Sequence, residues 1–171
     1  MPNWCFNSAS FSHEDHDKVA ALAAAFSVGN PMMTFMPPPG GEWDYGWCAE
    51  NWGTKWDVEA SDQADLDEGS VTVFFDSAWA PPIGFYRHMV EQGWSVDANY
   101  HESGMCFAGH FEDGEDRYYE YNFEDENWRD SIDDSDVLEI LENEYENYLM
   151  WKEEEEEAAK EELPENDEEG C

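Results

Sequence analysis

The segment ENWGTKWDVEA, residues 50–60, places two tryptophans four residues apart with a lysine between them. Lys55 is a scarce charge, because the chain of 171 residues contains only seven lysines and arginines. Tryptophan is bulky and usually lies where packing or recognition requires it. Trp52, Lys55 and Trp56 are therefore a candidate pocket, with Cys106 as a further lining residue. The same segment is also consistent with a loop that only marks the fold, and both interpretations stay open.

A catalytic nucleophile and its base would have to come from three cysteines and three histidines. They are Cys5, Cys48 and Cys106, and His88, His101 and His110. A reactive cysteine needs an electropositive neighbourhood, which a chain with 43 acidic residues supplies poorly. No P-loop, GxGxxG or GxSxG motif is present. We therefore predict no catalytic residue and no cofactor, and an enzyme with a site at the tryptophan loop is the less favoured class.

Two sequence patterns are weak candidates for metal binding. His13 and His16 stand three residues apart in HEDHD, but acidic residues are expected there because this is the first turn of a predicted helix. The stretch of residues 62–69 is rich in carboxylates but lacks the spacing of a calcium loop. We predict no dedicated metal site, and only weak, non-specific binding of divalent cations to so acidic a surface.

The charge balance limits the partners. With 43 acidic and seven basic residues the formal net charge is −36, so direct binding to nucleic acid or to an anionic membrane is disfavoured. Residues 124–171 contain 22 acidic and three basic residues, a net charge of −19, and the other 123 residues have a net charge of −17. The charge therefore leaves basic proteins, cations or no specific partner, and a basic host protein is the hypothetical partner that we predict.

Three explanations of the acidity stay open. In the first, carboxylates of the C-terminal segment act as phosphate surrogates and occupy the basic groove of a nucleic-acid-binding protein. The residues predicted to do so are Glu139, Glu142, Glu146, Glu153, Glu154, Glu155, Glu156 and Glu157. In the second, the surface is adapted to a halophilic or marine setting, and no partner recognises its acidic groups specifically. In the third, the tail is a disordered solubilising arm.

The hydrophobic pattern predicts the elements that would position these residues. Alternation predicts strands over residues 3–11, 55–61, 70–79 and 94–102 and a hairpin over residues 105–123 that turns at Asp113-Gly114. Helical spacing predicts helices over residues 12–29, with Ser12 as N-cap, and 80–93, and residues 62–69 are a polar turn. In the loop of residues 30–54, Pro37–Gly41 exclude regular structure.

This order of elements predicts an α+β chain in two parts. Residues 1–123 form a ferredoxin-like βαββαβ antiparallel sandwich, with both helices on one face and an added β-hairpin. Residues 124–171 form an acidic C-terminal helix with a frayed tail. No signal peptide and no membrane helix is visible, which predicts a cytoplasmic protein whose cysteines are free thiols.

Four segments in order, MPNWCFN, NWGTKWDVEA, FDSAWAPPI and GMCFAGHFE, resemble the YubB-type ferredoxin-like family of small phage- and plasmid-encoded proteins. The resemblance spans roughly residues 1–123. It implies a ferredoxin-like fold and a phage or plasmid origin, and it implies no activity, catalytic residue or cofactor. Together with the charge, it leads to the hypothesis of a phage accessory protein that acts by protein–protein interaction in the host cytoplasm. In that hypothesis an acidic nucleic-acid mimic inhibits or modulates a basic host protein.

Overall fold

The computed structural model of the protein describes residues 3–161. The chain is an α+β protein with a six-stranded antiparallel open sheet and a long C-terminal helix. The strands are β1 (Trp4–Ser12), β2 (Asp65–Asp67), β3 (Ser70–Ala78), β4 (Ser95–Glu102), β5 (Phe107–Glu112) and β6 (Glu115–Glu120), in the spatial order β2-β3-β1-β4-β5-β6. The helices are α1 (His16–Ser27), α2 (Pro31–Phe35), α3 (Tyr45–Asn51), α4 (Ile83–Glu91), the 3-10 turn η1 (Trp128–Ser131) and α5 (Ser135–Glu161).

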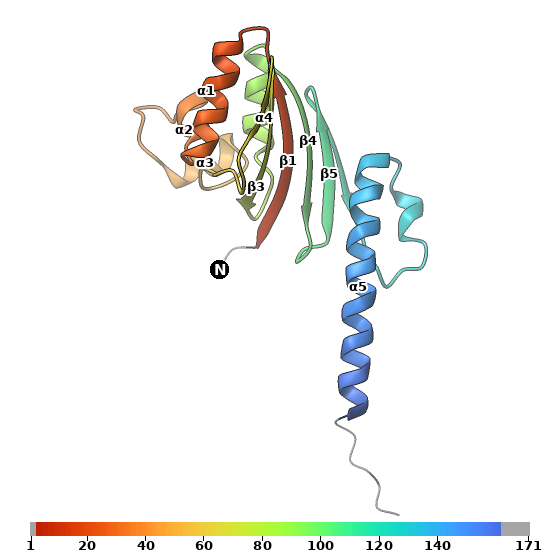
Figure 1. Cartoon of the computed structure of the whole chain (residues 1–171). Helices are drawn as coiled ribbons and strands as arrows, with labels where there is room; N and C mark the ends of the chain where they lie inside the picture. Colours follow the sequence, from red (N-terminus) through yellow and green to blue (C-terminus); the bar gives the residue numbers. More distant parts are fainter. Residues whose placement is uncertain (1–2, 162–171) are drawn as a thin grey trace, which may run out of the picture.

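The first core lies between the sheet and helices α1 and α4, which cover one face (Figure 1). Period-2 alternation in β1 turns Ala9 and Phe11 into this core and leaves Phe6 on the other face, 42% exposed. Phe11 is fully buried and packs against Phe26 of α1 and Phe85 of α4, with ring centroids 5.7 and 6.2 Å away. Buried aromatic contacts of this kind fix the two helices on one side of the sheet.

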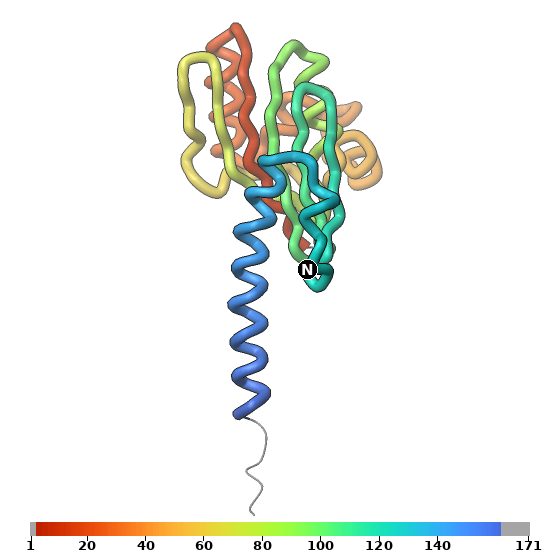
Figure 2. The backbone as a smooth tube through the Cα atoms, turned by 90° about the vertical axis from the view of Figure 1, so that its right-hand side faces the viewer, coloured from red at the N-terminus to blue at the C-terminus, as the bar shows by residue number. Residues whose placement is uncertain are grey.

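A second core lies on the opposite face, beneath the first turns of α5. It contains Ala108 and Tyr121 from the region of the hairpin, Trp128 and Ile132, and Val137 and Leu141 of α5. Beyond these turns α5 runs past the ends of the strands and stands away from the body of the molecule (Figures 1 and 2). The frayed tail predicted for the C-terminal residues lies, from residue 162 on, outside the described residues.

Most predicted elements are confirmed, with one change at a helix start. The hairpin turns at Asp113 and Gly114, whose φ values of 45° and 107° suit the two-residue turn that joins β5 and β6. The N-cap of α1 is Asp15, not the predicted Ser12, because the Asp15 carboxylate accepts hydrogen bonds from the backbone N–H groups of Asp17 and Lys18. Ser12 ends β1 instead.

The prediction of a strand over residues 55–61 is wrong. Only Ala60 makes an isolated bridge, to Phe75, and the strand that pairs with β3 is β2, inside the predicted polar turn. The reason is Asp57, whose carboxylate accepts hydrogen bonds from the N–H groups of Met32 and Met33 at the start of α2. These bonds hold Asp57 against α2, so the segment meets the sheet only at its end, where Ala60 bridges Phe75 and the Ser61 N–H donates to the Phe74 carbonyl.

The loop of residues 30–54 is more ordered than its composition suggests. It contains α2, which has Pro31 in its first turn, and α3, whose N-cap Asp44 accepts a hydrogen bond from the N–H of Trp47. Residues 37–41 form neither helix nor strand, as predicted. Trp52 closes the loop by burying its side chain completely.

Candidate binding site at the base of the C-terminal helix

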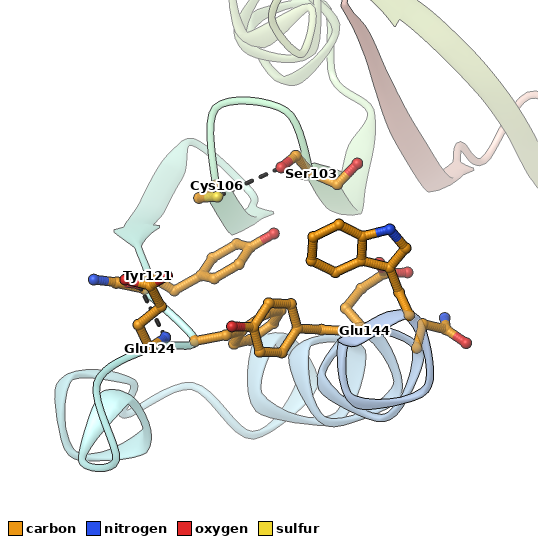
Figure 3. Close-up of a pocket in the computed structure, with 10 residues that line it drawn as sticks. Ser103, Cys106, Tyr121, Glu124 and Glu144 are labelled. Carbon is orange, nitrogen blue, oxygen red and sulfur yellow. Dashed lines mark hydrogen bonds between the residues drawn. The ribbon is translucent and has the colours of Figure 1, made fainter. Parts of the chain in front are cut away.

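A pocket of about 550 Å³ lies where α5 crosses the end of β6 and the turn between β4 and β5. Its walls include four aromatic side chains, Tyr121, Phe123, Tyr148 and Trp151. Figure 3 shows Ser103 and Cys106 of the turn on one side and Glu144 of α5 on the other. The pocket is therefore built from three segments of the chain that only the tertiary fold brings together.

The aromatic wall is continuous from the hairpin to α5. The Tyr121 and Phe123 ring centroids lie 4.5 Å apart, those of Phe123 and Tyr148 5.5 Å, and those of Tyr148 and Trp151 6.2 Å. Tyr121 is fixed at both ends, because its N–H donates to the Cys106 carbonyl over 3.0 Å and its hydroxyl lies 2.9 Å from the His101 Nε2. Trp151, in contrast, is 55% exposed, so one side of the wall is open to solvent.

The charged groups around the pocket are carboxylates. Burial lowers the pKa of His101, opposed by the charges of Glu144 and Glu102, so its imidazole is neutral at neutral pH. Burial raises the pKa of Tyr121, as do the nearby Cys106, Glu144 and Glu102, and the phenol keeps its proton. The Glu144 carboxylate is half-buried and forms no hydrogen bond or ion pair with any residue from 3 to 161. The pocket thus combines aromatic faces with an unpaired negative charge, a combination that suits a cation.

Thiol chemistry is not supported by the electrostatics. Burial, with the charge of Glu102, raises the pKa of Cys106, and its Sγ contacts the Ser103 carbonyl oxygen over 3.4 Å. Burial also raises the pKa of Cys48, and that of Cys5 to about 12. All three are free cysteines, as predicted. Because a nucleophile needs the thiolate, their raised pKa values argue against a catalytic cysteine.

The structure does not bring Cys106 together with the tryptophan loop. Trp52 belongs to the first core, where its indole N–H donates to the Met36 carbonyl over 2.8 Å, and Cys106 packs against the second core. Lys55 lies with its Nζ 4.3 Å from the ring centroid of Trp56 and 5.7 Å from that of Trp79. Trp56 is 40% exposed. Lys55 therefore contributes a cation–π contact at the surface.

The acidic residues predicted to bind a partner differ in their surroundings. Glu139, Glu146 and Glu153–Glu157 are exposed on α5. Glu142 is not a free charge, because both its oxygens accept hydrogen bonds from the Arg129 guanidinium, over 2.5 and 2.7 Å, and this pairing lowers the pKa of Glu142. Sequence reasoning missed Glu144, although its spacing to Tyr148 and Trp151, four and seven residues on, marks one face of a helix.

A second polar cluster joins α5 to the sheet and resembles a metal site only in composition. Ligand atoms of His110, Asp134 and Asp136 lie within 4.8 Å of one another. However, the two ring nitrogens of His110 contact Asp134 and Asp97, and the Arg117 guanidinium donates to the same Asp134 oxygen that His110 contacts. A cation would have to displace that guanidinium, so we interpret the cluster as a structural clamp.

Comparison with known proteins gives no match to a family model, to a curated protein or to a solved structure. Among residues 3–161, no helix is long and apolar enough to cross a membrane.

Proposed function

We propose that the protein binds a basic protein through the acidic surface of α5 and acts as a nucleic-acid mimic that inhibits or modulates that partner. The observation that carries the proposal is the second half of α5, which stands away from the body (Figures 1 and 2). Glu153–Glu157 are exposed there and form no ion pair with any residue of the described chain. Free carboxylates on a projecting helix are accessible to a groove that would otherwise hold nucleic acid.

The linear charge density supports mimicry. An α-helix rises about 1.5 Å per residue, so an unbroken glutamate run carries one negative charge per 1.5 Å or so of axis. Duplex DNA carries one per about 1.7 Å. Successive residues are also turned by about 100° around the helix, so the five glutamates present charge on all sides, as a duplex does. A protein groove lined with Lys and Arg therefore meets a comparable field.

The assignment of part of the sheet to a ferredoxin-like fold is also part of the proposal. We infer that β1, α1, β2, β3, α4 and β4 are a ferredoxin-like unit, and the neighbour order β2-β3-β1-β4 with α1 and α4 on one face supports this. The resemblance of residues 1–123 to the YubB-type family, and with it a phage or plasmid origin, likewise stays a proposal. That origin would make a host DNA- or RNA-binding protein the partner.

The test is a comparison of charge variants in capture from a bacterial lysate. The five glutamates 153–157 are changed to Gln in one variant. A matched control neutralises five exposed carboxylates elsewhere, Glu59, Asp62, Asp65, Asp67 and Glu68. We expect the unchanged protein and the control to capture basic nucleic-acid-binding proteins, to release them as salt approaches about 0.5 M, and to lose them to added duplex DNA.

Two outcomes would overturn the proposal. Retained capture by the Gln variant would show that the α5 run is not the binding surface. Equal loss in the Gln variant and in the control would show that only total charge matters, and would favour the general acidic adaptation of the surface instead.

A further inference from the structure

We propose that the pocket at the base of α5 binds one arginine side chain of the basic partner. The inference rests on the proposed function and names the side chain that the partner inserts. Trp151, an exposed wall residue of the pocket, stands only two residues before Glu153 on α5, so a partner seated on Glu153–Glu157 would lie next to the pocket.

The chain itself contains an occupied arginine site of the same chemistry. The Arg129 guanidinium carbon lies 4.4 Å from the ring centroid of Trp128 and 4.9 Å from that of Tyr145. The same guanidinium donates from Nε and from its terminal NH2 nitrogen to the two oxygens of Glu142. One carboxylate and two aromatic rings, two of these three groups from α5, are therefore sufficient to hold a guanidinium on this protein.

The pocket repeats that arrangement without its arginine. Glu144 corresponds to Glu142, and Tyr148 and Trp151 supply the rings, with Tyr121 from the hairpin. Glu144 has no partner within residues 3–161, whereas Glu142 is fully engaged. Lys152, beside the pocket on α5, places its Nζ 5.8 Å from the Tyr148 ring centroid and forms no ion pair with any described carboxylate. The pocket therefore offers aromatic faces and a free carboxylate to a cation from outside.

Arginine fits these groups better than lysine does. A guanidinium is planar, stacks on aromatic rings and donates two parallel hydrogen bonds to one carboxylate, whereas an ammonium is a compact and strongly hydrated point charge. A volume of about 550 Å³ also accepts the long arginine stem along the apolar wall. Selectivity for arginine over lysine is therefore the property that separates this pocket from the rest of the acidic surface.

The test uses two probes of equal charge, nona-arginine and nona-lysine peptides, titrated into the full chain at about 0.15 M salt by calorimetry. In the unchanged protein we expect nona-arginine to bind more tightly. Trp151→Ala and Glu144→Gln should each weaken nona-arginine about five- to tenfold, since cation–π and charge-assisted contacts are lost. They should change nona-lysine less than twofold. The matched controls are Trp4→Ala, a tryptophan of similar exposure on β1, and Glu146→Gln, an exposed glutamate outside the pocket.

A direct readout comes from the indole N–H resonance of Trp151, assigned by its absence in Trp151→Phe. It should shift on addition of nona-arginine and stay in place with nona-lysine. Equal effects of the pocket variants on both peptides, or no effect on either, would overturn the arginine site and leave the proposed function standing. Conversely, if Glu153–Glu157→Gln leaves both affinities unchanged, the proposed function fails. The effects of Trp151→Ala and Glu144→Gln on the two peptides still support or overturn the arginine site in that case.

Discussion

Asp134 connects α5 to the sheet, and its removal should loosen that connection measurably. The side chain is buried, 5% exposed, and uses both oxygens. One accepts from the N–H groups of Asp136 and Val137, which caps the start of α5, and the other lies 2.9 Å from Nδ1 of His110. The second oxygen also accepts a hydrogen bond from Arg117 over 2.8 Å. Asp134→Ala therefore removes the cap and the charged bonds at once, while the apolar packing around them is left in place.

The magnitude follows from the two functions. Loss of an N-cap costs about 1 kcal/mol, and loss of a buried charge-assisted hydrogen bond about 1.5–3 kcal/mol. Asp134→Ala should therefore lower the free energy of unfolding by about 2.5–4 kcal/mol in total. Asp134→Asn keeps an acceptor for the cap and should lose only about 2 kcal/mol, the share of the charged bond.

The assay is urea unfolding followed by tryptophan fluorescence and far-UV circular dichroism. With a slope of about 1–3 kcal/mol per molar for a small protein, the Ala variant should unfold at a midpoint lower by roughly 1–4 M. Glu146→Ala, an exposed change on the same helix, should stay within about 0.5 kcal/mol of the unchanged protein. An Ala variant as stable as this control would refute the clamp, and equal losses for Ala and Asn would refute the capping role.

Two further perturbations test the clamp at His110 and the packing of α4 against α3. Although burial lowers the pKa of His110, its hydrogen bonds with Asp134 and Asp97 raise it more, so the net pKa is raised. The bonds of protonated His110 therefore stabilise the fold fully below the ordinary histidine pKa of about 6.5, and this stabilisation is lost as pH rises through the pKa of His110 in the folded protein. The measured free energy of unfolding should fall over this pH range, and His110→Gln should make the fall smaller. Gly84→Ala would place a Cβ 1.9 Å from the Asn51 carbonyl oxygen, so it should cost about 3 kcal/mol by thermal unfolding. Gly46→Ala, whose Cβ meets only the Asp44 Oδ1 at 3.6 Å, should be neutral or slightly stabilising.

Elements whose buried face is set by local periodicity could be predicted from the sequence. The strand from Trp4, helix α1 and the Asp113-Gly114 hairpin are all signalled by residues that are neighbours in the chain. The start of α3 was also available, since Asp44 is a good N-cap, but the surrounding prolines and glycines hid it. Local signals are thus sufficient where the fold agrees with them.

The misplaced strand shows where local reading fails. Trp56, Val58 and Ala60 alternate like a strand, yet Val58 is buried while Trp56 is exposed. The sheet instead pairs with Asp65–Asp67, a stretch with no apolar face, because an edge strand needs only backbone hydrogen bonds from its neighbour. Which segment pairs with β3 depends on the hydrogen bonds that Asp57 accepts from the start of α2, far away in the sequence. The hydrophobic pattern of the sequence does not indicate these bonds.

The sequence indicates the residues of the pocket that belong to α5, but not those from the hairpin. Glu144, Tyr148 and Trp151 stand at helical spacing and could have been recognised as one face of α5. Their partner Tyr121 could not, because it reaches the helix only through the packing of the hairpin beneath α5. Arg129 pairs with Glu142 and leaves Glu144 unpaired, and this choice depends on the position of Arg129 in the tertiary structure.

The two edges of the open sheet have a consequence for self-association. Edge strands expose unpaired backbone groups that invite pairing with another copy. In this protein β2 is Asp-Leu-Asp, and β6 carries Glu115, Asp116 and Glu120. At neutral pH two such edges repel each other, so the acidity that suits a basic partner also keeps copies of the chain apart. Replacing these carboxylates by the corresponding amides would remove the repulsion and leave both edges free to extend the sheet from one molecule to the next.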